Sequence, residues 1–285
     1  MSANTGYRIV KLANGAHSVH SLAHAETFHP VVGPVAEAET LYVKQLNLVD
    51  RIRAHTGEFV IWDVGLGAAA NAITVLRATQ GLRCTIRLLS FDHTLDPLAF
   101  ALQNVGHLEY LREFEADLGE LIKRRVADLE FEDQVVRWEV HLADFPTLLS
   151  QPVAGALDKP HAIMFDAFSP AKNPAMWTQP LFANLFQLLD PNRPCALPTY
   201  SRSTLLRVTL LLAGFFVGVG HPTGEKEETT MAANSLQLLE EPLTRPWLER
   251  ARRSTSAEPM WEPVYRQAPL SAATWEKLQA HPQFR

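Results

Sequence analysis

Two stretches of the chain place carboxylates where they could act on a bound ligand. Asp63 closes an apolar run and is followed by a turn that contains Gly65 and Gly67. Asp166 closes a second apolar run and leads into a loop stiffened by prolines. A carboxylate held in this way can orient the N–H groups of an amine and take up a proton. The two stretches therefore predict a cofactor-binding site and a carboxylate that acts on a nitrogen nucleophile.

The glycine turn limits what the first stretch can bind. A strand followed by Asp63-x-Gly65-x-Gly67 and a helix presents backbone N–H groups and a positive helix N-terminus to a ligand. With Ala70 the turn also matches the looser dinucleotide pattern, so a nicotinamide or flavin enzyme is one interpretation. The charge of Asp63, two residues before the first glycine, suits an aminoacyl ammonium better than a pyrophosphate. This favours S-adenosylmethionine as the cofactor.

Two further carboxylates follow the next two predicted strands. Asp92 is placed to accept hydrogen bonds from a ribose diol, or else to cap the helix that follows it. Asp144, with Phe145 beside it, can reach an adenine amino group or cap a short helix. We expect both residues to bind the cofactor.

The loop that begins at Asp166 is the candidate catalytic segment. Methyl transfer from a sulfonium needs alignment and a nucleophile with a free lone pair, and it needs no metal. Asp166 could orient an amine and assist its loss of a proton, and Lys172 in the same loop could hold an anionic substrate. The four histidines near the N-terminus lack a metal-ligand pattern, but His29 is a candidate to line the crevice.

The hydrophobic pattern predicts the elements that position these residues. An Asn14-Gly15 turn indicates an opening β hairpin, and apolar residues at helical spacing indicate a helix over residues 34–52. Short apolar runs then alternate with helical patterns, which is typical of a parallel sheet. The predicted strands are 59–63, 84–91, 135–141, 162–166, 195–200, 215–220 and 229–233, and the predicted helices are 69–79, 96–104, 112–129, 178–189 and 202–213.

This alternation predicts an α/β, Rossmann-like fold: a mostly parallel, doubly wound sheet with an antiparallel last strand. We expect three parts. Residues 1–57 form a hairpin and helix packed on the main domain, residues 58–240 form the main domain, and residues 241–285 form an arm rich in proline, arginine and tryptophan. Ligands of such sheets bind beyond the carboxyl ends of the strands, so both stretches should face one crevice.

Composition bounds the function classes. The 285 residues include 26 basic and 31 acidic side chains, a net charge of -5, so no global positive field attracts nucleic acid. An RNA partner would need local basic patches, for which the candidates are residues 123–125, Arg202 with Arg207, Lys172 and the arginines of residues 245–253. Two cysteines, no signal-peptide pattern and no long apolar run predict a cytoplasmic protein without a membrane span.

Four segments of the chain form a longer pattern: Glu26-Thr27-Phe28-His29-Pro30, Gly33-Pro34-Val35-Ala36-Glu37-Ala38, the glycine loop with Asn71, and Asp166-Ala167-Phe168-Ser169-Pro170-Ala171-Lys172-Asn173-Pro174 followed by Met176-Trp177-Thr178. With these motifs, residues 7–239 resemble the methyltransferase domain of the MnmC family, which makes 5-methylaminomethyl-2-thiouridine in tRNA, and its free-standing homologues. Where the family's loop usually reads Gly-Phe-Gly-Thr-Gly-Leu-Asn, this chain reads Gly65-Leu66-Gly67-Ala68-Ala69-Ala70-Asn71.

The resemblance implies S-adenosylmethionine-dependent methylation of the 5-aminomethyl group of the wobble uridine of tRNA. It implies cofactor-loop roles for Asp63, Gly65, Gly67 and Asn71, a ribose role for Asp92 and a catalytic role for Asp166. It also implies a monofunctional enzyme without the family's flavin-dependent oxidase half. Two alternatives stay open: an aminopropyltransferase of the spermidine synthase type, and a catalytically inactive protein that keeps the S-adenosylmethionine fold.

Overall fold

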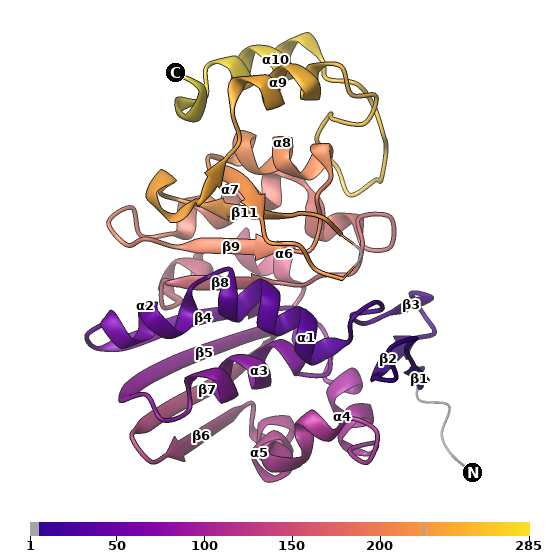
Figure 1. Ribbon diagram of the computed structural model, residues 1–285, viewed down its shortest axis with the longest axis vertical. Helices are drawn as coiled ribbons and strands as arrows, with labels where there is room; N and C mark the ends of the chain where they lie inside the picture. The colour runs from indigo at the N-terminus through magenta and orange to yellow at the C-terminus, as the bar shows by residue number, and fades with distance from the viewer. Residues whose placement is uncertain (1–5, 225) are drawn as a thin grey trace. The chain divides into compact units, whose positions relative to one another are not determined.

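A computed structural model describes residues 6–224 and 226–285 and divides the chain into two compact units. The first unit comprises the described residues within 1–144, 162–166 and 222–227, and the second comprises residues 145–161, 167–221 and 228–285. Figure 1 shows the course of the chain through the elements of both units.

The first unit opens with a small antiparallel sheet that runs β1-β2-β3 (Figure 1). Its strands are β1 (Tyr7–Lys11), β2 (His17–Ser21) and β3 (Glu26–Thr27). The Asn14-Gly15 turn joins the first two, which confirms the predicted hairpin, and Gly15 has the positive φ of 89° that such a turn requires. Three helical segments follow: α1 (Pro34–Ala38), the π-helix η1 (Glu39–Lys44) and α2 (Leu48–Ala54).

The main sheet of the first unit has the strand order β8-β4-β5-β7-β6. Strands β8, β4, β5 and β7 pair in parallel, and β6 pairs antiparallel with β7 at the edge. The strands are β4 (Glu58–Val64), β5 (Cys84–Asp92), β6 (Val126–Phe131), β7 (Gln134–Leu142) and β8 (Ala162–Phe165). The helices between them are α3 (Ala70–Thr79), α4 (Asp96–Leu102), the 3₁₀ helix η2 (Glu109–Phe114) and α5 (Glu115–Arg124). The large buried side chains of this core include Trp62, Phe91 and Trp138.

The second unit contains strands that pair antiparallel in the order β12-β10-β11-β9. They are β9 (Ala196–Thr199), β10 (Phe216–Gly220), β11 (Thr229–Ala233) and β12 (Glu241–Pro242). Its helices are α6 (Phe145–Leu149), η3 (Pro152–Ala156), η4 (Pro174–Trp177), α7 (Gln179–Leu188), α8 (Thr204–Ala213), η5 (Leu236–Leu238), α9 (Arg245–Arg252), α10 (Ala272–Gln279) and η6 (Pro282–Phe284). The antiparallel pairing of β11 confirms the predicted closing hairpin, and the division of the chain at residues 57 and 240 stays a prediction.

Two of the predicted helices are wrong in extent. The single helix expected over residues 112–129 ends at Arg124, because Arg125 turns the backbone left-handed at φ 64°, and β6 follows. The helix expected over residues 34–52 is interrupted by η1 and by Asn47, which has φ 47°. Non-glycine residues rarely adopt such angles. Of the two residues at these breaks, only Asn47 is of a type that favours turns, so little in the sequence indicated either break.

Across the described residues, no helix is both long enough and apolar enough to cross a bilayer.

Candidate active site

The carboxyl ends of the parallel strands bring the predicted site residues of the first unit side by side. The Asp166 N–H donates to Val64 O at 2.9 Å, so the pairing of β8 with β4 continues into the catalytic segment. On the other side of β4, the Gly65 N–H donates to Phe91 O at 2.9 Å. Asp166, the glycine loop and Asp92 are therefore neighbours along one edge of the sheet, as expected for a ligand site of an open parallel sheet.

Asp63 is a fully buried carboxylate at the end of β4. Its Oδ2 accepts a hydrogen bond from Ser90 Oγ at 2.7 Å, and Trp138 Nε1 donates to the same Ser90 oxygen at 2.9 Å. Its Oδ1 is buried and has no hydrogen-bond partner among the described residues. Burial raises the pKa of Asp63 to about 7, against the hydrogen bond from Ser90. A buried carboxylate oxygen without a partner is costly, and it fits a ligand that brings a cation or N–H donors.

The glycine loop turns tightly between β4 and α3. Gly65 and Gly67 have φ of 95° and 51°, and Ala69, just before α3, has φ of 60°. The Gly67 N–H donates to Asp92 Oδ2 at 3.0 Å, which ties the loop to the end of β5. A Cβ atom at Gly67 would lie 3.2 Å from the ring of Phe28, so both the angle and the space favour glycine there. The turn is thus kept although Ala69 stands where the family's loop usually has its third glycine.

Substituting Ala69 with glycine should stabilise the protein. An alanine in the left-handed region costs roughly 1–2 kcal/mol, while the greater freedom of glycine in the unfolded chain costs about 0.4–1 kcal/mol. The free energy of unfolding from urea titrations is therefore expected to rise by about 1 kcal/mol. Ala72→Gly is the matched control, because Ala72 is equally buried but lies within α3, where glycine destabilises. Equal destabilisation by both variants would contradict the strain at Ala69.

Asp92 and Asp144 lie near one another at the ends of β5 and β7. Asp92 Oδ1 accepts a hydrogen bond from the backbone N–H of His93 at 2.8 Å, and Ala143 N–H donates to Asp92 O at 2.9 Å. Asp144 is exposed. The hydrogen bond that the His93 ring donates to Asp92 raises the pKa of His93, and the charge of Asp144 adds to the rise. The structure thus brings the two carboxylates together, and their contacts to ribose and adenine stay predictions.

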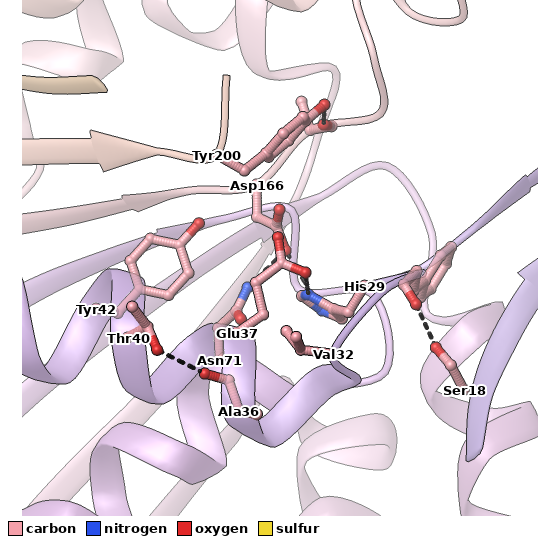
Figure 2. A network of polar contacts seen from close by, with 12 residues as sticks. Ser18, His29, Val32, Ala36, Glu37, Thr40, Tyr42, Asn71, Asp166 and Tyr200 are labelled. Carbon is pink, nitrogen blue, oxygen red and sulfur yellow. Dashed lines mark hydrogen bonds and ion pairs between the residues drawn. The ribbon is translucent and has the colours of Figure 1, made fainter. Parts of the chain in front are cut away.

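Asp166 lies in a compact network of polar side chains (Figure 2). Asn71 Nδ2 donates to Asp166 Oδ2 at 2.8 Å, and His29 Nε2 lies 3.5 Å from the same oxygen. The other ring nitrogen of His29, Nδ1, lies 3.7 Å from Glu37 Oε2. Burial raises the pKa of Asp166; the charge of His29 opposes the rise, and that of Glu37 adds to it. Asn71, which was expected at the cofactor, thus holds the predicted catalytic carboxylate through its amide nitrogen, while its Oδ1 is buried without a partner among the described residues.

Three members of this site were not predicted from the sequence. Glu37 was assigned only to a helix, Ser90 only to a strand, and Lys226 only to a polar connection. Lys226 lies near enough for its positive charge to act on both Glu37 and Asp166. The one available signal was that Glu37 and His29 both lie in segments that carry the family resemblance.

The loop after Asp166 belongs to the second unit, where two aromatic side chains fix its backbone. Trp177 Nε1 donates to Phe168 O at 2.7 Å, and the Tyr200 hydroxyl donates to Ala167 O at 3.0 Å. Lys172 has an exposed side chain, and its backbone N–H donates to Ser169 O at 2.8 Å. The predicted role of Lys172 in catalysis stays a prediction.

One of the basic residues considered for RNA contacts was assigned wrongly. Arg207 is only 3% exposed, and its guanidinium donates to Thr230 Oγ1, to Thr229 O and to Glu228 Oε1 at 3.1, 2.7 and 3.2 Å. This guanidinium links α8 to β11 within the second unit. Its hydrogen bonds are internal, so it is not part of a surface patch.

The carboxylate acceptors of the first unit fit S-adenosylmethionine. The unpaired oxygen of Asp63 would accept from its ammonium. Asp92 Oδ2 accepts the Gly67 N–H, and its second lone pair would accept from a ribose hydroxyl, while Oδ1 is occupied by the N–H groups of His93 and Thr94. Within residues 6–224 and 226–285, no group of three histidine, cysteine, aspartate or glutamate side chains is arranged to hold a metal ion.

The chain is similar to known proteins in sequence and in fold. Residues 110–235 match a family model described as S-adenosyl-L-methionine-dependent methyltransferase. The tRNA 5-methylaminomethyl-2-thiouridine biosynthesis bifunctional protein MnmC of Aeromonas hydrophila is 27% identical over 229 residues, which is 76% of this chain and 34% of that protein. The chain therefore spans about a third of the length of this curated relative.

Solved structures share the fold. The crystal structure of MnmC2 from Aquifex aeolicus is similar with a TM-score of 0.69 and 21% identity, covering 98% of this chain and 84% of that chain. A spermidine synthase in complex with the transition state analogue AdoDATO is similar with a TM-score of 0.50 and 11% identity, covering 96% and 85%. Residues 110–235 thus match the model of an S-adenosyl-L-methionine-dependent methyltransferase family, and the solved structures show that the chain shares their fold.

Proposed function

We propose that this protein is an S-adenosylmethionine-dependent methyltransferase that methylates an amine. The observation that carries the proposal is the pair of carboxylates at neighbouring strand ends, of which Asp63 is fully buried and Asp166 has a side chain that is only 16% exposed. Asp63 has an oxygen without a partner, and Asp166 is held by Asn71. One carboxylate is suited to a cofactor ammonium and the other to a substrate amine.

Different residues of the first unit would bind different parts of the cofactor. Asp63 would hold the ammonium of the cofactor, Gly65 and Gly67 would let the backbone approach it, Asp92 would hold its ribose, and Asp144 would reach its adenine. When bound, S-adenosylmethionine supplies a methyl group on a positively charged sulfur. The protein's remaining task is to present an amine with a free lone pair in the right orientation.

Asp166 is suited to that task. A primary amine is protonated near neutrality, so it has no lone pair until one N–H bond is broken. An ionised carboxylate close to the amine can hold the N–H groups and accept that proton. Asn71 donates to Asp166 Oδ2, which leaves Oδ1 available to the substrate.

We propose that the amine is the 5-aminomethyl group of the wobble uridine of tRNA. The support is the relationship to MnmC proteins, whose name states a role in tRNA 5-methylaminomethyl-2-thiouridine biosynthesis. Lys172, exposed in the segment that follows Asp166, would contact a phosphate of the RNA. The proposal covers methyl transfer without flavin-dependent oxidation, in the cytoplasm, where tRNA is modified.

Calorimetry combined with nucleoside analysis tests the proposal. We expect the purified protein to bind S-adenosylmethionine and S-adenosylhomocysteine, and tRNA from cells that lack the protein to accumulate 5-aminomethyl wobble uridines. Absence of binding to either ligand would contradict the methyltransferase assignment. Binding combined with an unchanged nucleoside profile would contradict tRNA as the substrate, and aminopropyl transfer from decarboxylated S-adenosylmethionine to putrescine would replace methyl transfer by the spermidine synthase reaction.

A further inference from the structure

His29 occupies an unusual position between two carboxylates. Its ring nitrogens lie 3.7 Å from Glu37 Oε2 and 3.5 Å from Asp166 Oδ2, and the side chains of His29, Glu37 and Asp166 are only 8%, 9% and 16% exposed. Figure 2 shows the imidazole between the two acids. Two anions this close would repel strongly in a site with little water, and a cation between them removes that repulsion.

Several contacts of the small N-terminal sheet position this imidazole. β3 pairs with β2, the Phe28 N–H donates to Val19 O at 2.9 Å, and Ser18 Oγ donates to Phe28 O. His29 itself has a φ of 49°, a left-handed conformation that few non-glycine residues adopt but that histidine, like asparagine and aspartate, tolerates better than most. The small N-terminal sheet therefore fixes the backbone up to residue 28, and the turn at His29 directs the ring toward Asp166.

We propose that His29, held by Glu37, is a positioning residue that keeps the Asp166 carboxylate ionised and oriented so that it can take the proton lost by the substrate amine. This role rests on the proposed function. In the proton transfer the N–H bond of the substrate ammonium breaks, its electron pair stays on nitrogen as the nucleophilic lone pair, and an O–H bond forms on Asp166. His29 does not touch the substrate; it acts through Asp166.

The charges around His29 agree with this role. Burial alone would lower the pKa of His29, but the negative charges of Asp166 and Glu37 outweigh it and raise the pKa. The hydrogen bond and charge of His29 in turn lower the pKa of Glu37 against the effect of burial. Among the described residues, two more charged groups act on this cluster: Lys226, whose positive charge lowers the pKa of both Glu37 and Asp166, and Asp63, which interacts electrostatically with Asp166.

Titration of His29 by NMR tests the charge arrangement without any assay of activity. With the signal of His29 assigned by its loss in His29→Asn, the imidazole should titrate above its ordinary pKa in the wild type. It should titrate at least about one pH unit lower in Glu37→Gln and in Asp166→Asn, since an opposite charge at this distance shifts a pKa by roughly 1–3 units. A His29 pKa at its ordinary value, or one that neither substitution changes, would overturn the inference.

The pH profile of methyl transfer tests the role in the reaction. Asparagine tolerates the left-handed backbone of residue 29, so His29→Asn removes the cation with little strain. Without the cation, Asp166 ionises only at higher pH. We therefore expect kcat/KM to fall about tenfold at pH 6.5 and to approach the wild-type value within about twofold at pH 9, since one pH unit corresponds to a tenfold change in ionisation.

His20→Asn is the control, because it removes an imidazole from the same small sheet but leaves the network of Asp166 intact. A loss in His29→Asn that is equal at every pH would show a merely structural role and overturn the inference. Coupled titration in a protein that transfers no methyl group would overturn the proposed function and leave the charge arrangement standing, so the two failures are distinguishable.

Discussion

Replacing Asp166 with asparagine should slow methyl transfer by about a hundredfold to ten-thousandfold, the usual contribution of a positioned acid or base. Asparagine keeps an oxygen that can accept from Asn71 Nδ2, so the local structure should survive. It cannot take a proton from the substrate ammonium. Single-turnover rates with saturating cofactor measure the effect, and calorimetry should show an S-adenosylhomocysteine affinity within about threefold of the wild type, because Asp166 is assigned to the amine.

Asp128→Asn is the matched control for this prediction. Asp128 is an exposed residue of β6 that pairs with Arg137, so its substitution should leave the rate unchanged. A wild-type rate in Asp166→Asn would show that the carboxylate is structural. A large loss of cofactor affinity would instead place Asp166 in the cofactor site.

Replacing Asp63 with asparagine should weaken cofactor binding and stabilise the free protein at the same time. Loss of one partner of a buried charge pair costs roughly 2–5 kcal/mol, so S-adenosylhomocysteine affinity should fall at least about thirtyfold. In the wild type the ammonium selects the ionised carboxylate. The pKa of Asp63 is about 7 in the free protein. The affinity of the wild type for S-adenosylhomocysteine should therefore fall about tenfold for each pH unit below 7, and this pH dependence should vanish in Asp63→Asn.

The same raised pKa predicts that the substitution stabilises the free protein although it weakens cofactor binding. The pKa of Asp63 rises from 3.8 in the unfolded chain to about 7 in the folded protein, so ionisation opposes folding. The cost is absent below about pH 4, grows as the pH rises, and is complete above pH 7 at roughly 4 kcal/mol. Urea titrations should therefore show Asp63→Asn equal to the wild type near pH 4 and more stable by a few kcal/mol at pH 8.

Asp50→Asn controls for the loss of a carboxylate, because Asp50 is an exposed residue paired with Arg53. It should change neither binding nor the pH dependence of stability. If Asp63→Asn binds the cofactor normally at pH 8, the ammonium site lies elsewhere. If its stability follows that of the wild type at every pH, Asp63 is not the desolvated carboxylate described here.

Much of the main sheet was predictable because its strands carry clear signals. β4, β5, β7 and β8 are short apolar runs between helical patterns, and the rule that ligands bind at their carboxyl ends placed Asp63, Asp92 and Asp166 correctly along one edge. β6 was missed because its alternating Val126-Ala127-Asp128-Leu129 follows directly on an amphipathic helix. Only the left-handed Arg125 separates the two, and arginine carries no turn signal.

The network around Asp166 could not be predicted in the same way. Its members come from the loop before α1, from α1, from α3, from the end of β8 and from the 222–227 segment. No periodicity relates residues so far apart in the chain, and only the packing of α1 on α3 and the pairing of β2 with β3 bring His29, Glu37 and Asn71 to one carboxylate. Arg207 shows the converse error, because a charged residue on an apolar helix was assigned to the surface although internal hydrogen bonds hold it in the core.

We propose that the site that contains Asp63 and Asp166 methylates an amine on tRNA. The most direct test incubates the purified protein with S-adenosylmethionine and tRNA whose wobble uridine carries a 5-aminomethyl group, followed by mass spectrometry of the nucleosides. We predict conversion of that nucleoside to its methylaminomethyl form by the wild type, and little conversion by Asp166→Asn over the same time. An unmodified nucleoside after incubation with a protein that binds S-adenosylmethionine would contradict the claim.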